Sequence, residues 1–178
     1  MTDTLTATDV RTAFARRDIL TAGLTATAPE LARACHAMAG RFARGGRLLA
    51  FGEGLAATDA AHVVVEFAHP VIVGKRALPA LRLADPAWLP VFAEADDIAL
   101  GFAPHGSDRR VPDALAAAAA GGLLTVALVG AAGAGRLPGV AHVLAVPSDD
   151  ARIVREAHVT TYHVLWELVH VFLEAGVA

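Results

Sequence analysis

Short, mainly apolar runs recur along this chain, and they constrain its fold more than any other feature. The runs lie at 47–51, 80–83, 98–102, 123–129 and 142–146. An unbroken run of this length is typical of a strand that is buried on both faces, as in a parallel sheet. Segments with helical spacing alternate with them, at 58–67, 111–120 and 151–174. The pattern predicts an α/β fold with a doubly wound, parallel, five-stranded sheet flanked by helices.

Two further helices are expected before the first strand. Apolar residues recur at helical spacing from Asp9 to about Arg44, with a break near Pro29 and a stop at Gly45. Such helices either form a packing arm for a partner subunit or cover the sheet of their own subunit, and the sequence leaves both alternatives open. We expect one domain over residues 1–178, with oligomerisation helices over 1–45 and an α/β core over 46–178.

Composition excludes several classes of function. A formal charge of −3 gives no basic surface for nucleic acid. The apolar runs are shorter than the roughly 20 residues of a membrane span, and the polar start lacks a signal sequence, so we expect a cytoplasmic protein without membrane contact. The single cysteine, Cys35, allows no internal disulfide. Apolar residues make up 55% of only 178 residues, more than a small domain buries alone, which favours a homo-oligomer, a dimer or a tetramer.

Two helical segments carry residues suited to proton transfer. His62 and Glu66 are four residues apart and therefore share one face of a helix. The last helix contains His158 and His163. A histidine beside a carboxylate can move protons near neutral pH, and the same residue types bind zinc. The competing interpretation is a hydrogen-bonded histidine in a helix interface beside a solvated glutamate.

Two loops between strands and helices are candidate ligand sites. The loop after the first run contains Gly52, Glu53 and Gly54, whose glycines let backbone N–H groups approach a ligand while the carboxylate would repel an anion. The loop after the third run supplies one hydroxyl, that of Ser107. Neither loop is specific evidence by itself.

These residues together resemble a known family. Gly52-Glu53-Gly54, then Asp59-Ala60-Ala61-His62 and Glu66, resembles the start of the sugar isomerase (SIS) domain of phosphoheptose isomerases, which typically carries a GNGGSxxDAxH segment with a glutamate four residues after the histidine. The similarity continues through the strand ending in Asp85, through Gly101-Phe102 and through 125–130. It ends with Glu156-Ala157-His158 followed by His163. It covers most of the chain, including the two leading helices.

The resemblance implies a three-layer SIS sandwich, a homotetramer, and the aldose–ketose isomerisation of sedoheptulose 7-phosphate. By position, Glu66 and His163 match the residues that trade protons. His62, Glu66 and His163 also fall where family members hold zinc, and the resemblance implies no other cofactor. The implied ligand is a small sugar or sugar phosphate, and the positions matched to substrate binding are Gly52, Glu53, Gly54, Asp59, Asp85, His105, Gly106, Ser107 and Arg155.

The phosphate-binding features of the family are altered. Its turn with a TSGNS core reads Ala103-Pro104-His105-Gly106-Ser107 here, Glu53 replaces an asparagine, and Arg155 replaces a glutamine. Fewer hydroxyl donors and an added carboxylate predict weak phosphate binding. Two hypotheses follow: a divergent SIS isomerase or related proton-transfer enzyme, and a non-catalytic SIS oligomer that binds or regulates.

Overall fold

The computed structural model describes residues 6–105, 109–135 and 137–176, without the side chains of 19–22. Its helices are α1 (Ala7–Ala26), α2 (Ala28–Ala43), α3 (Ala56–Ala68), α4 (Leu89–Phe92), α5 (Arg110–Ala120) and α6 (Ala151–Ala175). Its strands are β1 (Leu48–Gly52), β2 (Ala80–Arg82), β3 (Ile98–Ala103), β4 (Leu124–Val129) and β5 (His142–Ala145). Short 3₁₀ turns lie at Pro86–Trp88 and Ala131–Gly133.

The five strands form one parallel sheet in the order β2-β1-β3-β4-β5. This confirms the doubly wound α/β fold that the apolar runs predict. The order reverses between β1 and β3, where Leu48 lies opposite Ile98. Loops that leave the carboxyl ends of strands at such a point diverge to opposite faces of the sheet, so this edge is suited to ligand binding.

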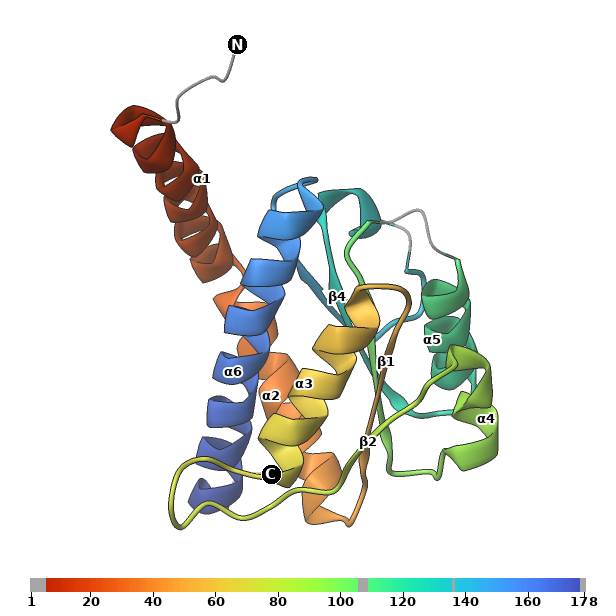
Figure 1. Cartoon of the computed structure of the whole chain (residues 1–178). Helices are drawn as coiled ribbons and strands as arrows, with labels where there is room; N and C mark the ends of the chain where they lie inside the picture. Colours follow the sequence, from red (N-terminus) through yellow and green to blue (C-terminus); the bar gives the residue numbers. More distant parts are fainter. Residues whose placement is uncertain (1–5, 106–108, 136, 177–178) are drawn as a thin grey trace.

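Alternate residues of the strands point into two separate cores. Leu48, Ala50 and Phe102 belong to the core beneath α2, α3 and α6. Leu49 and Phe51 belong to the core beneath α4 and α5. Burial on both faces explains why β1 and β3 appear in the sequence as unbroken apolar runs. The helices lie on both sides of the sheet in three layers (Figure 1).

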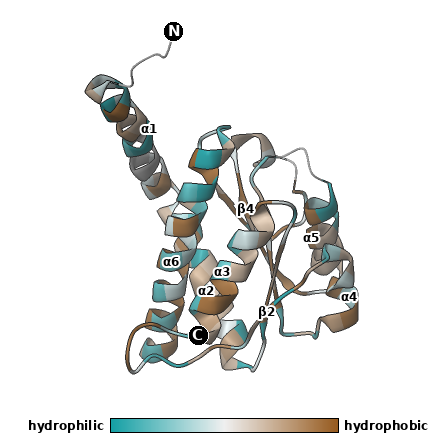
Figure 2. Ribbon diagram, viewed as in Figure 1, coloured by the Kyte–Doolittle hydropathy of each residue, from teal (hydrophilic) through white to brown (hydrophobic). Residues whose placement is uncertain are grey.

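The two N-terminal helices behave differently, and only α2 covers the sheet of its own subunit. α2 buries Leu31, Cys35, Met38 and Phe42 against its own subunit. α1 projects away from the body (Figure 1), and Phe14 on it is 67% exposed. Hydrophilic and hydrophobic residues mix along α1, whereas the central strands are hydrophobic (Figure 2). Within the described residues, none of the helices is both long enough and apolar enough to cross a membrane.

Candidate active site

A carboxylate with a histidine on either side lies between α3 and α6. His62 Nε2 is 3.0 Å from Glu66 Oε1, and His163 Nε2 is 3.6 Å from the same oxygen. His62 and Glu66 extend from a face of α3 that lies beside the buried stripe containing Val63 and Phe67. The side chain of Glu66 is 16% exposed, whereas both histidines are nearly half exposed. The carboxylate is therefore shielded, and the imidazoles meet solvent.

These three side chains come together within a single chain. The contact of His163 with Glu66 needs no partner subunit. α3 and α6 pack side by side on the same face of the sheet, so His163 approaches Glu66 of its own subunit (Figure 1). The separation of 3.6 Å is longer than a hydrogen bond, which leaves Glu66 and His163 to exchange protons through a ligand or a water.

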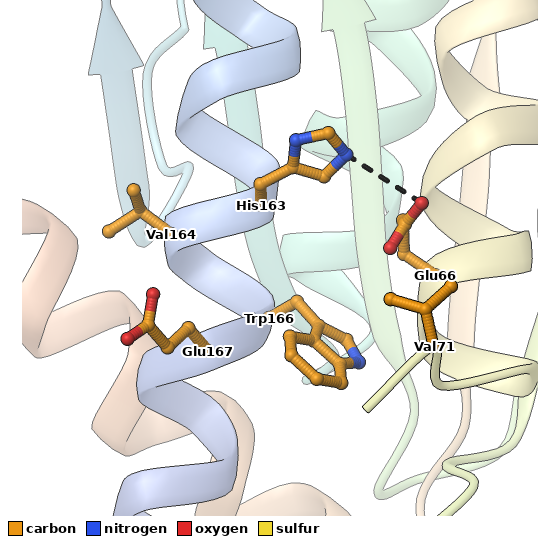
Figure 3. Close-up of a pocket in the computed structure, with 6 residues that line it drawn as sticks. All are labelled: Glu66, Val71, His163, Val164, Trp166 and Glu167. Carbon is orange, nitrogen blue, oxygen red and sulfur yellow. Dashed lines mark ion pairs between the residues drawn. The ribbon is translucent and has the colours of Figure 1, made fainter. Parts of the chain in front are cut away.

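A pocket of about 330 Å³ opens beside Glu66 and His163. Figure 3 shows Trp166 and Glu167 of α6 and Val71 of the segment after α3 around the same space. The indole N–H of Trp166 is buried and makes no hydrogen bond within the described residues. The pocket thus combines an apolar wall with groups that can donate and accept protons, as small-molecule sites commonly do.

An ion pair also joins α3 to α6, nearer the start of both helices than this cluster. The guanidinium of Arg155 donates to both carboxylate oxygens of Asp59, at 2.8 and 3.1 Å, and to the hydroxyl of Thr58 at 2.8 Å. Asp59 is 3% exposed. The sequence analysis placed Arg155 among the positions matched to substrate binding. In the structure its guanidinium is paired with the buried Asp59 carboxylate, so its positive charge is largely neutralised within the protein.

A second arginine is ion-paired with two carboxylates at the carboxyl ends of the strands. Arg110, at the start of α5, is ion-paired with Glu53 of the first loop and with Asp85, the latter at 2.6 Å. Asp85 also accepts a hydrogen bond from the backbone N–H of Ala87, at 2.9 Å. The backbone N–H and the guanidinium of Arg110 lower the pKa of Asp85. Glu53 is therefore not an isolated charge that only repels anions, as the sequence analysis inferred.

The glycines of the first loop serve its shape. Gly54 has a φ of 54°, in the left-handed region that favours glycine. A side chain at Gly52 would lie 2.8 Å from the backbone oxygen of Ala56, so the strand could not turn this closely into α3. Both glycines bring β1 close to the start of the helix that bears His62 and Glu66.

The other matched positions lie away from the Glu66 cluster. Gly52, Glu53 and Gly54 precede α3, whereas Glu66 is ten residues into that helix, about 15 Å along its axis. His105 is exposed after β3. Gly106 and Ser107 lie outside the described residues. One chain thus has two groups of candidate site residues: a proton-transfer cluster between the helices and a polar edge at the strand ends.

His158 is a third histidine on α6, and it is fully buried. Burial lowers its pKa to about 4, although the backbone of Val129 and the carboxylate of Asp59 oppose that shift. Neither ring nitrogen has a hydrogen-bond partner of good geometry within the described residues. Its neutral ring packs 5.9 Å from the ring of Phe102, which assigns it to the core.

Comparison with known proteins places this chain among its relatives. A phosphoheptose isomerase from Thermodesulfovibrio yellowstonii is 34% identical over 143 residues, which cover 70% of this chain and 71% of that protein. A phosphoheptose isomerase from a Geobacter species is 31% identical over 171 residues, covering 85% of this chain and 88% of that protein. The chain belongs to the phosphoheptose isomerase family.

The fold agrees with this membership. The structure of a phosphoheptose isomerase from Francisella tularensis superposes with a TM-score of 0.80 at 22% identity, covering 93% of this chain and 98% of that one. The likeness confirms the three-layer sugar isomerase fold expected from the sequence. No family model matches the chain.

The residues that could hold zinc in this phosphoheptose isomerase relative are His62, Glu66 and His163. Their ligand atoms all lie within 4.8 Å of one another. Two imidazoles and a carboxylate, with a fourth position open toward a pocket, form a donor set that fits a catalytic zinc ion. Small movements of the side chains would bring the three atoms to the separations of a tetrahedral site.

Two residues near the cluster were missed by the sequence analysis. The hydroxyl of Tyr162 is 2.6 Å from His62 Nδ1, and Trp166 forms a wall of the pocket. A signal was available for the first, because the chain has only one tyrosine and it directly precedes His163. Trp166 follows His163 by three residues and shares its helix face, but that spacing equally predicts a core residue.

Proposed function

We propose that this chain interconverts the aldose and ketose forms of a sugar phosphate, with Glu66 and His163 moving the protons. The observation that carries the proposal is the shielded Glu66 carboxylate, with an imidazole 3.6 Å away on α6 and a pocket beside both. The name of the relatives points to a heptose phosphate, and sedoheptulose 7-phosphate is the substrate we propose.

The chemistry needs one carbon-bound proton to move between neighbouring carbons. Glu66 removes the proton from the carbon next to the carbonyl, and the electron pair forms the carbon–carbon double bond of an enediol. His163 gives a proton to the carbonyl oxygen as charge develops there. Return of a proton to the former carbonyl carbon, and loss of one from the hydroxyl of the carbon that first gave up its proton, complete the exchange without net oxidation. Zinc bound at the cluster would supply polarisation of the carbonyl.

We propose that two copies of the chain complete each site. The polar edge at Glu53, Asp85 and Arg110 is about 15 Å from Glu66 along α3, too far to contact the same ligand as Glu66 within a small site. In an oligomer, the edge of one subunit can instead face the Glu66 cluster of a partner. The exposed α1 and the exposed segment containing Val71 and Val73 offer apolar surface for such contacts. A dimer or tetramer in the cytoplasm is the assembly we propose.

Light scattering should give the mass of a dimer or a tetramer at micromolar concentration. Replacement of Phe14 by serine should shift the population toward a smaller species, because it removes an aromatic side chain that is 67% exposed in the single chain. Ala13→Ser on the same helix is the control and should leave the mass unchanged. A monomeric parent protein would contradict the assembly.

Replacement of Glu53 by glutamine should strengthen binding of the sugar phosphate and lower its KM by about 3- to 10-fold. The change removes one carboxylate from the polar edge and leaves Arg110 with Asp85 as its partner. Free sedoheptulose should bind equally well to both proteins, because it carries no phosphate charge. A higher KM for the sugar phosphate in Glu53→Gln would show that Glu53 contacts substrate hydroxyls instead.

Turnover of sedoheptulose 7-phosphate to the aldose product tests the proposed function. The proposed function predicts that this protein forms the aldose from sedoheptulose 7-phosphate. Fructose 6-phosphate, a shorter sugar phosphate, is the comparison substrate. The non-catalytic alternative predicts binding of a ligand without any product. A binding protein has no need of a proton-transfer cluster beside the pocket, and this favours the enzyme.

A further inference from the structure

The hydroxyl of Tyr162 has no part in the reaction as described so far, yet it contacts the site. It lies 2.6 Å from Nδ1 of His62, while Nε2 of the same ring lies 3.0 Å from Glu66 Oε1. Tyr162 is fully buried on α6, and His62 is on α3. A neutral imidazole has one N–H and one bare nitrogen, so the partner of Nδ1 determines what Nε2 offers to Glu66.

Two arrangements of protons are open to this chain of contacts. In the first, the phenol of Tyr162 donates to Nδ1 and the N–H at Nε2 donates to the Glu66 carboxylate. Every polar group then has a complementary partner. In the second, Nδ1–H donates to the phenol oxygen, and the bare Nε2 of His62 faces a carboxylate oxygen.

The second arrangement is unfavourable at both ends. The proton of the buried phenol would have no acceptor within the described residues, and a buried donor without a partner costs the free energy of its desolvation. The lone pairs of His62 Nε2 and Glu66 Oε1 would repel each other at 3.0 Å.

We propose that Tyr162 is a positioning residue that holds His62 with its proton on Nε2, so that His62 donates to Glu66 and zinc binding at the cluster is weakened. The inference rests on the proposed function in taking Glu66 as the reacting base. The His62 hydrogen bond then fixes one oxygen of the carboxylate. The other oxygen stays available to a substrate in the pocket.

The effect on metal binding follows from counting hydrogen bonds. Zinc bound through His62 Nε2 needs that nitrogen bare, which moves the ring proton to Nδ1. Tyr162 must then accept, and its own proton is left without a partner. In Tyr162→Phe, Nδ1 lacks a partner both before and after zinc binds, so the switch leaves no additional group unpaired. The phenylalanine variant should therefore bind zinc about 10-fold more tightly.

Nitrogen-15 NMR of histidine-labelled protein tests the arrangement of protons directly. The ring of His62 is identified by its loss from the spectrum of His62→Gln. We expect the proton on Nε2, and an Nδ1 resonance displaced by the hydrogen bond it accepts. That displacement should vanish in Tyr162→Phe. A His62 ring protonated on Nδ1 in the parent protein would overturn the proposal.

Zinc titration against a coloured chelator gives a second readout on the same proteins. Zinc binding that is lost in His62→Gln is assigned to this site. Thr161→Val is the matched control, because it removes a buried hydroxyl from the same helix that bonds only the backbone oxygen of Ala157, at 2.8 Å. Tyr162→Phe should tighten zinc binding about 10-fold and Thr161→Val should not.

Equal zinc affinity in the parent protein and Tyr162→Phe would overturn the proposal, as would equal tightening in Thr161→Val. Neither measurement requires a substrate. Protein that isomerises no sugar phosphate but shows the expected NMR and zinc results would therefore contradict the proposed function and support the role of Tyr162.

Discussion

Glu66→Gln should reduce the turnover of sedoheptulose 7-phosphate by about 10²- to 10⁴-fold, the usual contribution of a general base. Glutamine keeps the size of the side chain and cannot take a proton from carbon. The loss should appear in kcat with little change in KM, because the amide still fills its place beside the pocket. Steady-state kinetics of the purified variant measures both values.

Folding should survive this change. Glu66 is partly exposed, and the buried ion pair that joins α3 to α6, between Asp59 and Arg155, does not involve it. Glu94→Gln is the matched control: its side chain is 78% exposed and pairs with Arg47 in the loop region before β3, away from the pocket. Equal loss of activity in both variants, or full activity in Glu66→Gln, would contradict the assignment of Glu66 as the base.

Asp59→Ala should lower the free energy of unfolding by about 2–3 kcal/mol, measured by urea denaturation. The change leaves the guanidinium of Arg155 without its main partner in a place where Asp59 is 3% exposed. Because the pair joins α3 to α6, kcat should also fall about 10-fold as His163 shifts relative to Glu66.

The double variant Asp59→Ala/Arg155→Ala separates the charge from the packing. It should recover part of the lost stability, because no buried charge remains unpaired. Arg152→Ala on α6 is the control; its pair with Asp150 is largely exposed and should change stability by less than about 0.5 kcal/mol. An Asp59→Ala protein as stable as its parent would show that solvent replaces the pair.

Much of the fold could be predicted from the sequence because burial on both faces leaves a direct pattern. The segments Leu48–Phe51 and Ile98–Phe102 contain no polar residue, as strands between two cores require. The separate behaviour of α1 and α2 could not be predicted. Both helices carry apolar residues at helical spacing, and only the packing of Cys35 and Met38 under α6 identifies α2 as the covering helix.

Less of the candidate site could be predicted. The spacing of His62 and Glu66 fixes their common helix face, and the family resemblance adds His163. The partners of the charged groups depend on contacts between residues far apart in sequence. Arg155 meets Asp59 across 96 residues, and Arg110 meets Asp85 across 25. No local pattern reveals such pairs, so the sequence analysis matched Asp59, Asp85 and Arg155 to substrate binding without seeing that they are paired within the protein.

Isomerisation in heavy water tests the central claim most directly. Proton transfer through Glu66 predicts that the sugar phosphate recovered from the parent protein carries deuterium at the carbon next to the carbonyl, together with product, as seen by proton NMR and mass spectrometry. Glu66→Gln should give neither within the same time, while Glu94→Gln should match the parent. Sugar phosphate that binds to the parent protein, yet returns with no deuterium on carbon and no product, would contradict the account.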